Sequence, residues 1–169
     1  MNVNVLVSEL ASAPAIVRAL TSGVPRRVLL QRPAPDAWCM LEVLCLLLHE
    51  ERFDFGPRLD ATLHRSGQPW PDSDWDGWMK AYQAEPPELE ATLNAWETER
   101  RRSLAWLRSL VAPDWDATYQ ANWGPIRAGD VLAAWAAHDI LHQRQLVRLR
   151  YDRIVARAAP YGVCYAGEW

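Results

Sequence analysis

Four stretches of the sequence repeat apolar residues at spacings of three and four, and this pattern constrains the fold more than any other feature. The stretches cover approximately residues 5–20, 36–64, 88–110 and 130–150. Apolar residues spaced in this way fall on one face of a helix, which has to be buried against another element. No stretch shows the alternation that is typical of a β-strand. We therefore predict an all-α fold, a four-helix bundle that forms one domain over residues 1–169.

Prolines and capping residues set the expected boundaries of the first two helices. Pro14 is expected to kink or split the first helix, and Gly56–Pro57 is expected to bend the second. The second helix begins near Asp36, a good N-cap residue, or at Cys39, which forms a capping-box pattern with Glu42. Both starting points are compatible with the sequence.

The composition argues against several classes of partner. The net charge is −3, and binding to nucleic acid or to an anionic membrane would need a basic patch. The longest apolar run, residues 43–48, is too short to cross a bilayer, and the N-terminus lacks the basic segment of a signal peptide. The three cysteines, Cys39, Cys45 and Cys164, do not form an even set for disulfides. We therefore expect reduced thiols and a cytoplasmic location.

One face of the fourth helix carries two histidines in the middle of an apolar stripe. Residues at spacings of three and four on this face are Val131, Trp135, His138, His142, Gln145 and Leu149. Burying two imidazoles without partners would cost roughly a few kcal/mol. One divalent metal ion satisfies both, because histidines at i and i+4 can direct nitrogens at a common point. We predict such an ion at His138 and His142; hydrogen-bonded core histidines are the alternative.

Charged residues are expected on the outer faces of the last two long helices. Water is the predicted environment of Glu97, Glu99, Arg100, Arg101 and Arg102 in the third helix. In the fourth helix, Arg144, Arg148 and Asp139 are assigned to the side opposite the histidines, and Asp139 is expected to face either water or another helix.

A third metal ligand has to come from another helix, and His49 is the candidate. It lies on the second helix and shares a face with Cys45 and Phe53. Three imidazoles around an ion, with one position left for water, are typical of a catalytic site. Cys45 is either a fourth ligand or a small buried apolar residue. The remaining histidine, His64, lies at a helix end, where a contact with the helix dipole is expected.

Tryptophan is abundant, with ten residues in the chain. Trp38, Trp96, Trp106 and Trp135 fall in helical stripes or at a helix start and are expected in or near the core. Six others lie in or near loops, among them Trp75 at the start of a short helix expected near residues 75–83. These six either cover the ends of the bundle or line a pocket for a flat or apolar ligand.

Several motifs, in the same order and over most of the chain, resemble the DinB-like superfamily, which includes the YfiT-type bacillithiol S-transferases. The motifs are RPAPDAW at 32–38, EVL at 42–44, EERF at 50–53 and HDILHQRQ at 138–145. The resemblance implies a four-helix bundle with up-down-down-up topology, often a homodimer. It also implies a site of three histidines that holds nickel, zinc or a similar divalent ion.

The resemblance assigns two of these ligands to His138 and His142. In the second helix, the place of the family's usual histidine is held by Leu46, and His49 fills the place of the usual acidic residue three positions later. Residues three apart share a helix face. His49 can therefore complete the site from one turn further on, or the site has only two histidines.

Two functions follow as alternatives. In the first, the protein is a metal-dependent enzyme that transfers a low-molecular-weight thiol to an electrophile, or catalyses a hydrolysis, with the metal activating the nucleophile. Glu50 and Glu51 are then candidates for acid–base work, although no catalytic residue is assigned. In the second, the protein is a non-enzymatic, stress-related bundle whose metal site is incomplete, as Leu46 suggests.

Overall fold

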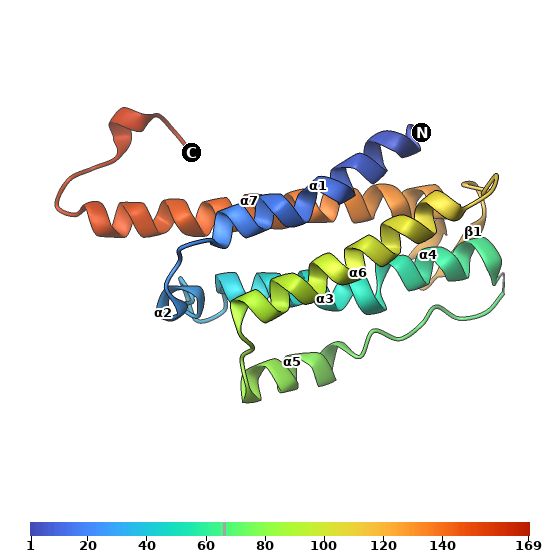
Figure 1. Cartoon of the computed structure of the whole chain (residues 1–169), viewed down its shortest axis with the longest axis horizontal. Helices are drawn as coiled ribbons and strands as arrows, with labels where there is room; N and C mark the ends of the chain where they lie inside the picture. The colour runs from blue at the N-terminus through green and yellow to red at the C-terminus, as the bar shows by residue number, and fades with distance from the viewer. Residues whose placement is uncertain (66) are drawn as a thin grey trace.

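The computed structural model describes residues 1–65 and 67–169 and consists mainly of long helices (Figure 1). The bundle helices are α1 (Val3–Thr21), α3 (Met40–Phe53) continued by α4 (Phe55–His64), α6 (Leu89–Ser109) and α7 (Ala128–Ala158). The smaller elements are α2 (Arg26–Leu29), α5 (Trp75–Ala84), β1 (Thr118–Ala121), β2 (Gly124–Arg127) and the 3-10 turn η1 (Cys164–Ala166). The predicted helical bundle is confirmed.

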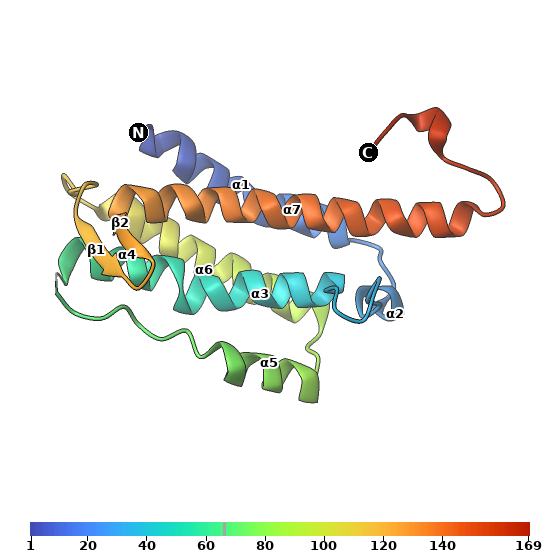
Figure 2. The same cartoon turned by 180° about the vertical axis from the view of Figure 1, so that it is seen from behind.

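The order and direction of the helices give the up-down-down-up topology (Figures 1 and 2). α1 and α7 run side by side in one direction, whereas α3–α4 and α6 run in the other. The parallel pair α3 and α6 requires a long return connection, and α5 lies within it, on the outer side of α3. Figure 2 also shows that the last turns of α7 project beyond the other helices. The topology implied by the family resemblance is therefore confirmed.

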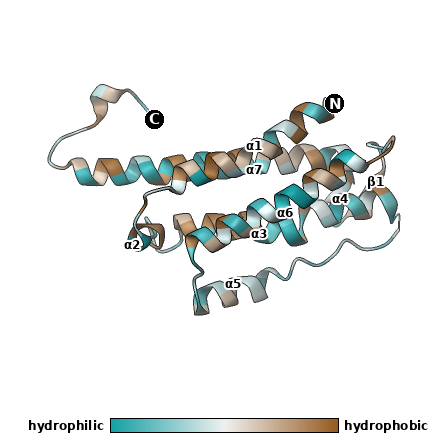
Figure 3. Ribbon diagram, viewed as in Figure 1, coloured by the Kyte–Doolittle hydropathy of each residue, from teal (hydrophilic) through white to brown (hydrophobic). Residues whose placement is uncertain are grey.

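The core forms where the apolar stripes of these helices meet. Hydrophobic and hydrophilic residues alternate around each long helix, as expected of amphipathic helices (Figure 3). One cluster of buried side chains centres on α3 and includes Leu44 and Trp96; a second centres on α7 and includes Trp135 and Leu132. The predicted core positions of Trp96 and Trp135 are confirmed, since both are almost completely buried.

Pro14 does not split α1, which continues without a break from Val3 to Thr21. A proline lacks the N–H that would bond to the carbonyl four residues earlier, so Pro14 leaves the Leu10 carbonyl without its helical partner. Arg100 donates a hydrogen bond to that carbonyl at 2.8 Å. The free carbonyl created by the proline is thus satisfied by a side chain from α6.

By length and composition, α1 is the one helix in residues 1–65 and 67–169 that could cross a membrane. The same properties are found in core helices of bundles. Leu10, Ala13 and Val17 are fully buried in the structure, and α1 packs along both α6 and α7.

The predicted bend in the second helix lies slightly earlier than Gly56–Pro57. α3 ends at Phe53, and α4 begins at Phe55, with Asp54 between them. The ring of Pro57 would collide with the Phe53 carbonyl in a continuous helix, which accounts for a break at that point. At the other end, α3 begins after Cys39, whose backbone N–H donates to Glu42 at 2.8 Å, so the capping-box start is the one observed.

Two expectations about secondary structure are wrong. Residues in the link before α7 form an antiparallel hairpin, in which Ala121 pairs with Gly124. Burial alternates along both strands, but each strand has only four residues, so the sequence carries little strand signal. In addition, α7 ends at Ala158 rather than near Arg150.

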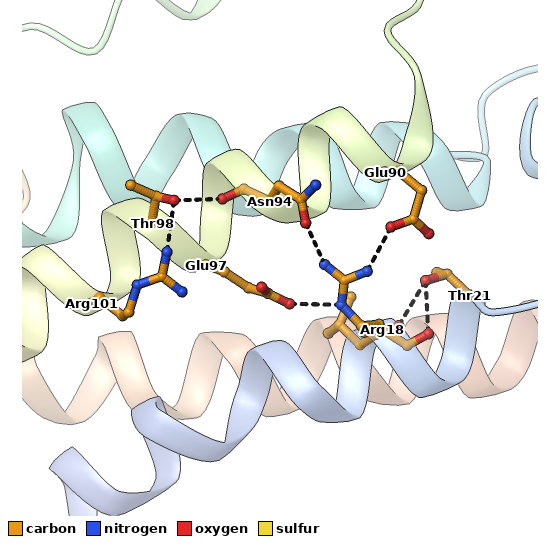
Figure 4. A network of polar contacts seen from close by, with 8 residues as sticks. Arg18, Thr21, Glu90, Asn94, Glu97, Thr98 and Arg101 are labelled. Carbon is orange, nitrogen blue, oxygen red and sulfur yellow. Dashed lines mark hydrogen bonds and ion pairs between the residues drawn. The ribbon is translucent and has the colours of Figure 1, made fainter.

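A polar network joins α1 to α6 on the side of the bundle shown in Figure 4. The guanidinium of Arg18 donates to Glu97 at 2.7 Å, to Glu90 at 2.6 Å and to Asn94 at 2.8 Å. These three acceptors lie on one face of α6, at spacings of three and four. One arginine therefore fixes the register of two helices that are distant in the sequence.

Replacing Arg18 with methionine, which keeps an apolar stem of similar length, is expected to lower the free energy of unfolding by about 1 kcal/mol. The loss is modest because the arginine and Glu90 are partly exposed to water. Urea denaturation measures it, with the exposed Arg27→Met as the matched control. A loss no larger than that of the control would show that the network does not stabilise the bundle.

Candidate metal centre

α7 brings His138 and His142 together, one helical turn apart and facing α3. Their Nε2 atoms lie 2.9 Å from each other, and their ring centroids are 4.3 Å apart. Both side chains are partly buried. At this distance one nitrogen donates a hydrogen bond to the other, since two lone pairs would repel each other. The histidine pair predicted from the i, i+4 spacing thus has its nitrogens directed at a common point.

Gln145 orients His142 from the next turn of α7. The Nδ1 atom of His142 lies 2.8 Å from the Gln145 side-chain oxygen, to which Nδ1–H donates. This bond leaves the lone pair of His142 on Nε2, the nitrogen that faces His138. Burial, together with neighbouring His138, lowers the pKa of His142, so its neutral form is favoured. Neutral imidazole is the form that binds metals.

Glu50 on α3 supplies a carboxylate next to the pair. Its Oε2 atom lies 2.8 Å from His138 Nε2, yet it has no hydrogen-bond partner among residues 1–65 and 67–169. The contact is therefore an ion-pair distance without the angle of a hydrogen bond. A buried carboxylate oxygen without a partner is costly, and a cation between it and the imidazoles would satisfy it.

His49 lies on a different side of α3. Its ring packs against Phe53 at 5.1 Å and against Trp78 of α5 at 5.2 Å, measured between centroids. Neighbouring positions on a helix differ by about 100°, so Glu50 and His49 cannot both face α7. The structure thus brings together two of the three predicted histidines and places the third against α5. Cys45, the candidate fourth ligand, is buried on that same side.

Within the described parts of the chain, no three histidine, cysteine, aspartate or glutamate side chains are already arranged to hold a metal ion. Glu50, His138 and His142 instead form a chain of close contacts. Two imidazole nitrogens and one carboxylate oxygen are nonetheless a donor set suited to zinc, nickel or iron. The chemistry of these donors and the partnerless oxygen of Glu50 fit a divalent ion.

Asp54 and Phe55 border this site, and sequence reasoning missed both. Asp54 lies one turn after Glu50, and burial raises the pKa of its carboxyl, although Arg58 pairs with it at 2.9 Å. Phe55 packs its ring 5.0 Å from that of His138. The i, i+4 spacing of Glu50 and Asp54 was a usable signal, but the helix break that positions Phe55 was not visible as a site feature.

A buried ionic cluster joins the two helices that carry the site. Arg100 of α6 donates to Glu51 at 2.7 Å and to Asp139 at 2.5 Å, and all three side chains are almost completely buried. Trp135 also donates to Glu51, through its indole nitrogen, at 3.2 Å. Glu51 follows Glu50 in α3, and Asp139 follows His138 in α7. By binding Glu51 and Asp139, Arg100 therefore holds the backbones of α3 and α7 next to the site.

The expectation that Arg100 faces water is therefore wrong, whereas Asp139 meets another helix, α6, which is one of the two environments expected for it. Arg100 lies four residues after Trp96 and four before Leu104, so it belongs to the buried stripe of α6. Asp139 similarly lies four residues after Trp135 on the buried side of α7. Each charge is buried because its partner is supplied by another helix, and burial raises the pKa of Asp139 against the attraction of Arg100.

The family of this chain follows from comparison with known proteins. A model of the DinB superfamily matches residues 9–146, which is most of the chain. The chain therefore belongs to the DinB superfamily, and the family predicted from its motifs is confirmed.

A solved structure with a similar fold is that of YfiT from Bacillus subtilis, described as a probable metal-dependent hydrolase with an unusual four-helix bundle topology. The two chains share 15% identity, the match covers 89% of this chain and 87% of that chain, and the TM-score is 0.76. At this identity the likeness establishes the fold. A search of curated proteins found no match.

Proposed function

We propose that this chain is a metal-dependent member of its superfamily, in which His138 and His142 bind one divalent ion and Glu50 provides the third protein ligand. The observation that carries this proposal is a row of three donor atoms in close contact, with 2.9 Å between the two imidazole nitrogens and 2.8 Å from His138 Nε2 to the Glu50 carboxylate. Gln145 supports it by keeping the lone pair of His142 on Nε2. Nickel and zinc are the ions we expect first.

A bound divalent ion would lower the pKa of a coordinated water or thiol and so provide a nucleophile near neutral pH. The residues of this chain hold and surround that position: the imidazoles and Glu50 bind, Gln145 orients, and Phe55 excludes water from one side of His138. This arrangement is compatible with the transfer of a low-molecular-weight thiol or with a hydrolysis. The homodimer and the cytoplasmic location stay predictions.

Titration of metal-free protein with zinc or nickel tests the proposal. We expect uptake of about one ion per chain, and the loss of tight uptake in His142→Ala, because one imidazole then remains. His64→Ala is the matched control, since that histidine is exposed and pairs with Asp60 at 2.9 Å. Elemental analysis after dialysis and calorimetric titration give the two readouts.

A chain that takes up neither ion would overturn the metal-dependent proposal. The second candidate, a non-enzymatic bundle with an incomplete site, would then stand. Leu46 is the observation that favours it, because this buried side chain holds the place of the family's usual histidine and offers no donor atom.

A further inference from the structure

A pocket separate from the histidine pair lies between α2, the link that follows α2, and the last turns of α7. Its volume is about 310 Å³, within the range of pockets that hold small molecules. Figure 1 shows α2 next to the end of α7, where α7 projects beyond the other helices. One wall of the pocket is therefore formed by the turns of α7 near and beyond Arg150, where helical spacing had predicted that this helix ends.

The inner wall of the pocket is apolar. Val28 of α2 and Met40 at the start of α3 are buried members of one core cluster, and Leu149 of α7 packs against that cluster. Ala156, two turns after Leu149, adds a small apolar side chain near the opening. A ligand that places an apolar group against this wall removes apolar surface from water, which favours binding.

Two arginines of α7, Arg153 and Arg157, line the same pocket. They lie four residues apart, so their side chains leave the same face of the helix, and their like charges repel each other. Other arginines nearby are paired: Arg148 contacts Asp152 at 2.9 Å, and Arg150 donates to the Leu20 carbonyl at 2.7 Å. Arg153 and Arg157 make no ion pair or hydrogen bond through their side chains to any group in residues 1–65 and 67–169. An anion between them would relieve the repulsion.

The remaining charge in the lining does not compensate the two arginines. Asp152 also lines the pocket, but both of its carboxylate oxygens accept from Arg148 Nε, at 2.9 and 3.1 Å. Guanidinium groups bind a carboxylate well, because their N–H groups can donate to both of its oxygens. The pocket thus combines an apolar wall with a positively charged edge, which suits a molecule that has an apolar chain and one ionised acid group.

We propose that the pocket between α2 and the end of α7 binds a small amphipathic carboxylate. Its apolar chain lies against Val28, Met40 and Leu149, and its ionised group lies between Arg153 and Arg157. The wall supplied by α7 begins at residue 149, after the region that the family model matches, 9–146. Occupation of this pocket does not depend on a metal ion, so this proposal and the metal-dependent function can fail separately.

Equilibrium dialysis of metal-free, full-length protein with octanoate and with octanamide tests the proposal. The two probes have the same chain and nearly the same shape, but only octanoate is charged near neutral pH. We expect octanoate to bind about tenfold more tightly or better, because hydrogen bonds between two charged groups are the stronger ones. Equal affinities, or no binding of either probe, would overturn the proposal. Tighter binding of octyl phosphate than of octanoate would assign the pocket to a phosphate instead of a carboxylate.

Two variants locate the binding site. Arg153→Met combined with Arg157→Met removes both charges and keeps apolar stems, so the preference for octanoate should fall to less than about twofold. Ala156→Trp fills the pocket from its exposed side and should abolish the binding of both probes. Circular dichroism verifies that each variant is folded, since arginines near a helix C-terminus also stabilise the helix.

The matched control is Arg101→Met combined with Arg144→Met, which removes two exposed positive charges outside the pocket. We expect it to keep the preference of the wild type. An equal loss in this control would show that octanoate responds only to the overall charge. Unchanged binding in Ala156→Trp would show that the probes bind elsewhere, and a retained preference in the folded Arg153 and Arg157 double variant would exclude the proposed contact.

Discussion

Arg100→Met is expected to lower the free energy of unfolding by about 3–5 kcal/mol, because removal of one partner leaves a buried charge without compensation. The guanidinium is the cation that faces the buried carboxylates of Glu51 and Asp139, and it also satisfies the Leu10 carbonyl. Native domains are stable by only about 5–15 kcal/mol in total. This substitution therefore removes a large share of the stability of the protein.

Urea or thermal denaturation of the purified variant measures the loss. Arg101→Met is a matched control one residue away, where the side chain is exposed and its hydrogen bond within the described residues goes to Thr98. The effect of this control should stay within about 0.5 kcal/mol. Combining Arg100→Met with Glu51→Gln and Asp139→Asn removes all three charges and should recover part of the loss. If Arg100→Met and Arg101→Met were equally stable, the buried cluster would not be the stabilising feature described above.

The second large effect concerns the third metal ligand. Glu50→Gln is expected to weaken zinc binding by about 100-fold or more, since changes to residues that only support a ligand already cost 10–100-fold. His49→Phe should change the affinity by less than about threefold, because His49 packs against α5 rather than against the histidine pair. Glu50 and His49 are adjacent in the chain, yet we expect a large loss of zinc affinity from one substitution and almost none from the other.

Calorimetric zinc titrations of both variants decide whether Glu50 or His49 is the third metal ligand. Glu90→Gln on the surface is the control for the loss of a carboxylate. A strong loss of affinity in His49→Phe with little change in Glu50→Gln would restore the three-histidine site that the sequence predicts. Circular dichroism of each variant at the titration temperature separates a lost ligand from a lost fold.

Local patterns in the sequence were sufficient to predict the helices and the family. Helical spacing predicted α1, α5 and α6 to within two residues at each end, because an amphipathic stripe and its proline or glycine boundaries are properties of a short segment. The same reasoning brought His138 and His142 together, since residues four apart on one helix are neighbours in any fold.

Relations between helices required the tertiary structure. Charge alone assigned Arg100 to water and left both water and another helix open for Asp139, whereas the places of both residues in the helical stripes agree with burial. A charged residue is buried only when another element supplies its partner, and no local pattern reveals that Glu51 and the Leu10 carbonyl meet Arg100.

The sequence by itself thus determined the helical class, the family and the histidine pair, because each depends on residues within a few turns of one another. Only the tertiary structure decided that Glu50 faces α7 and that His49 faces α5. The two residues are adjacent in the chain, and the rotation of α3 about its own axis, which its packing against α6 and α7 fixes, separates them by about 100°.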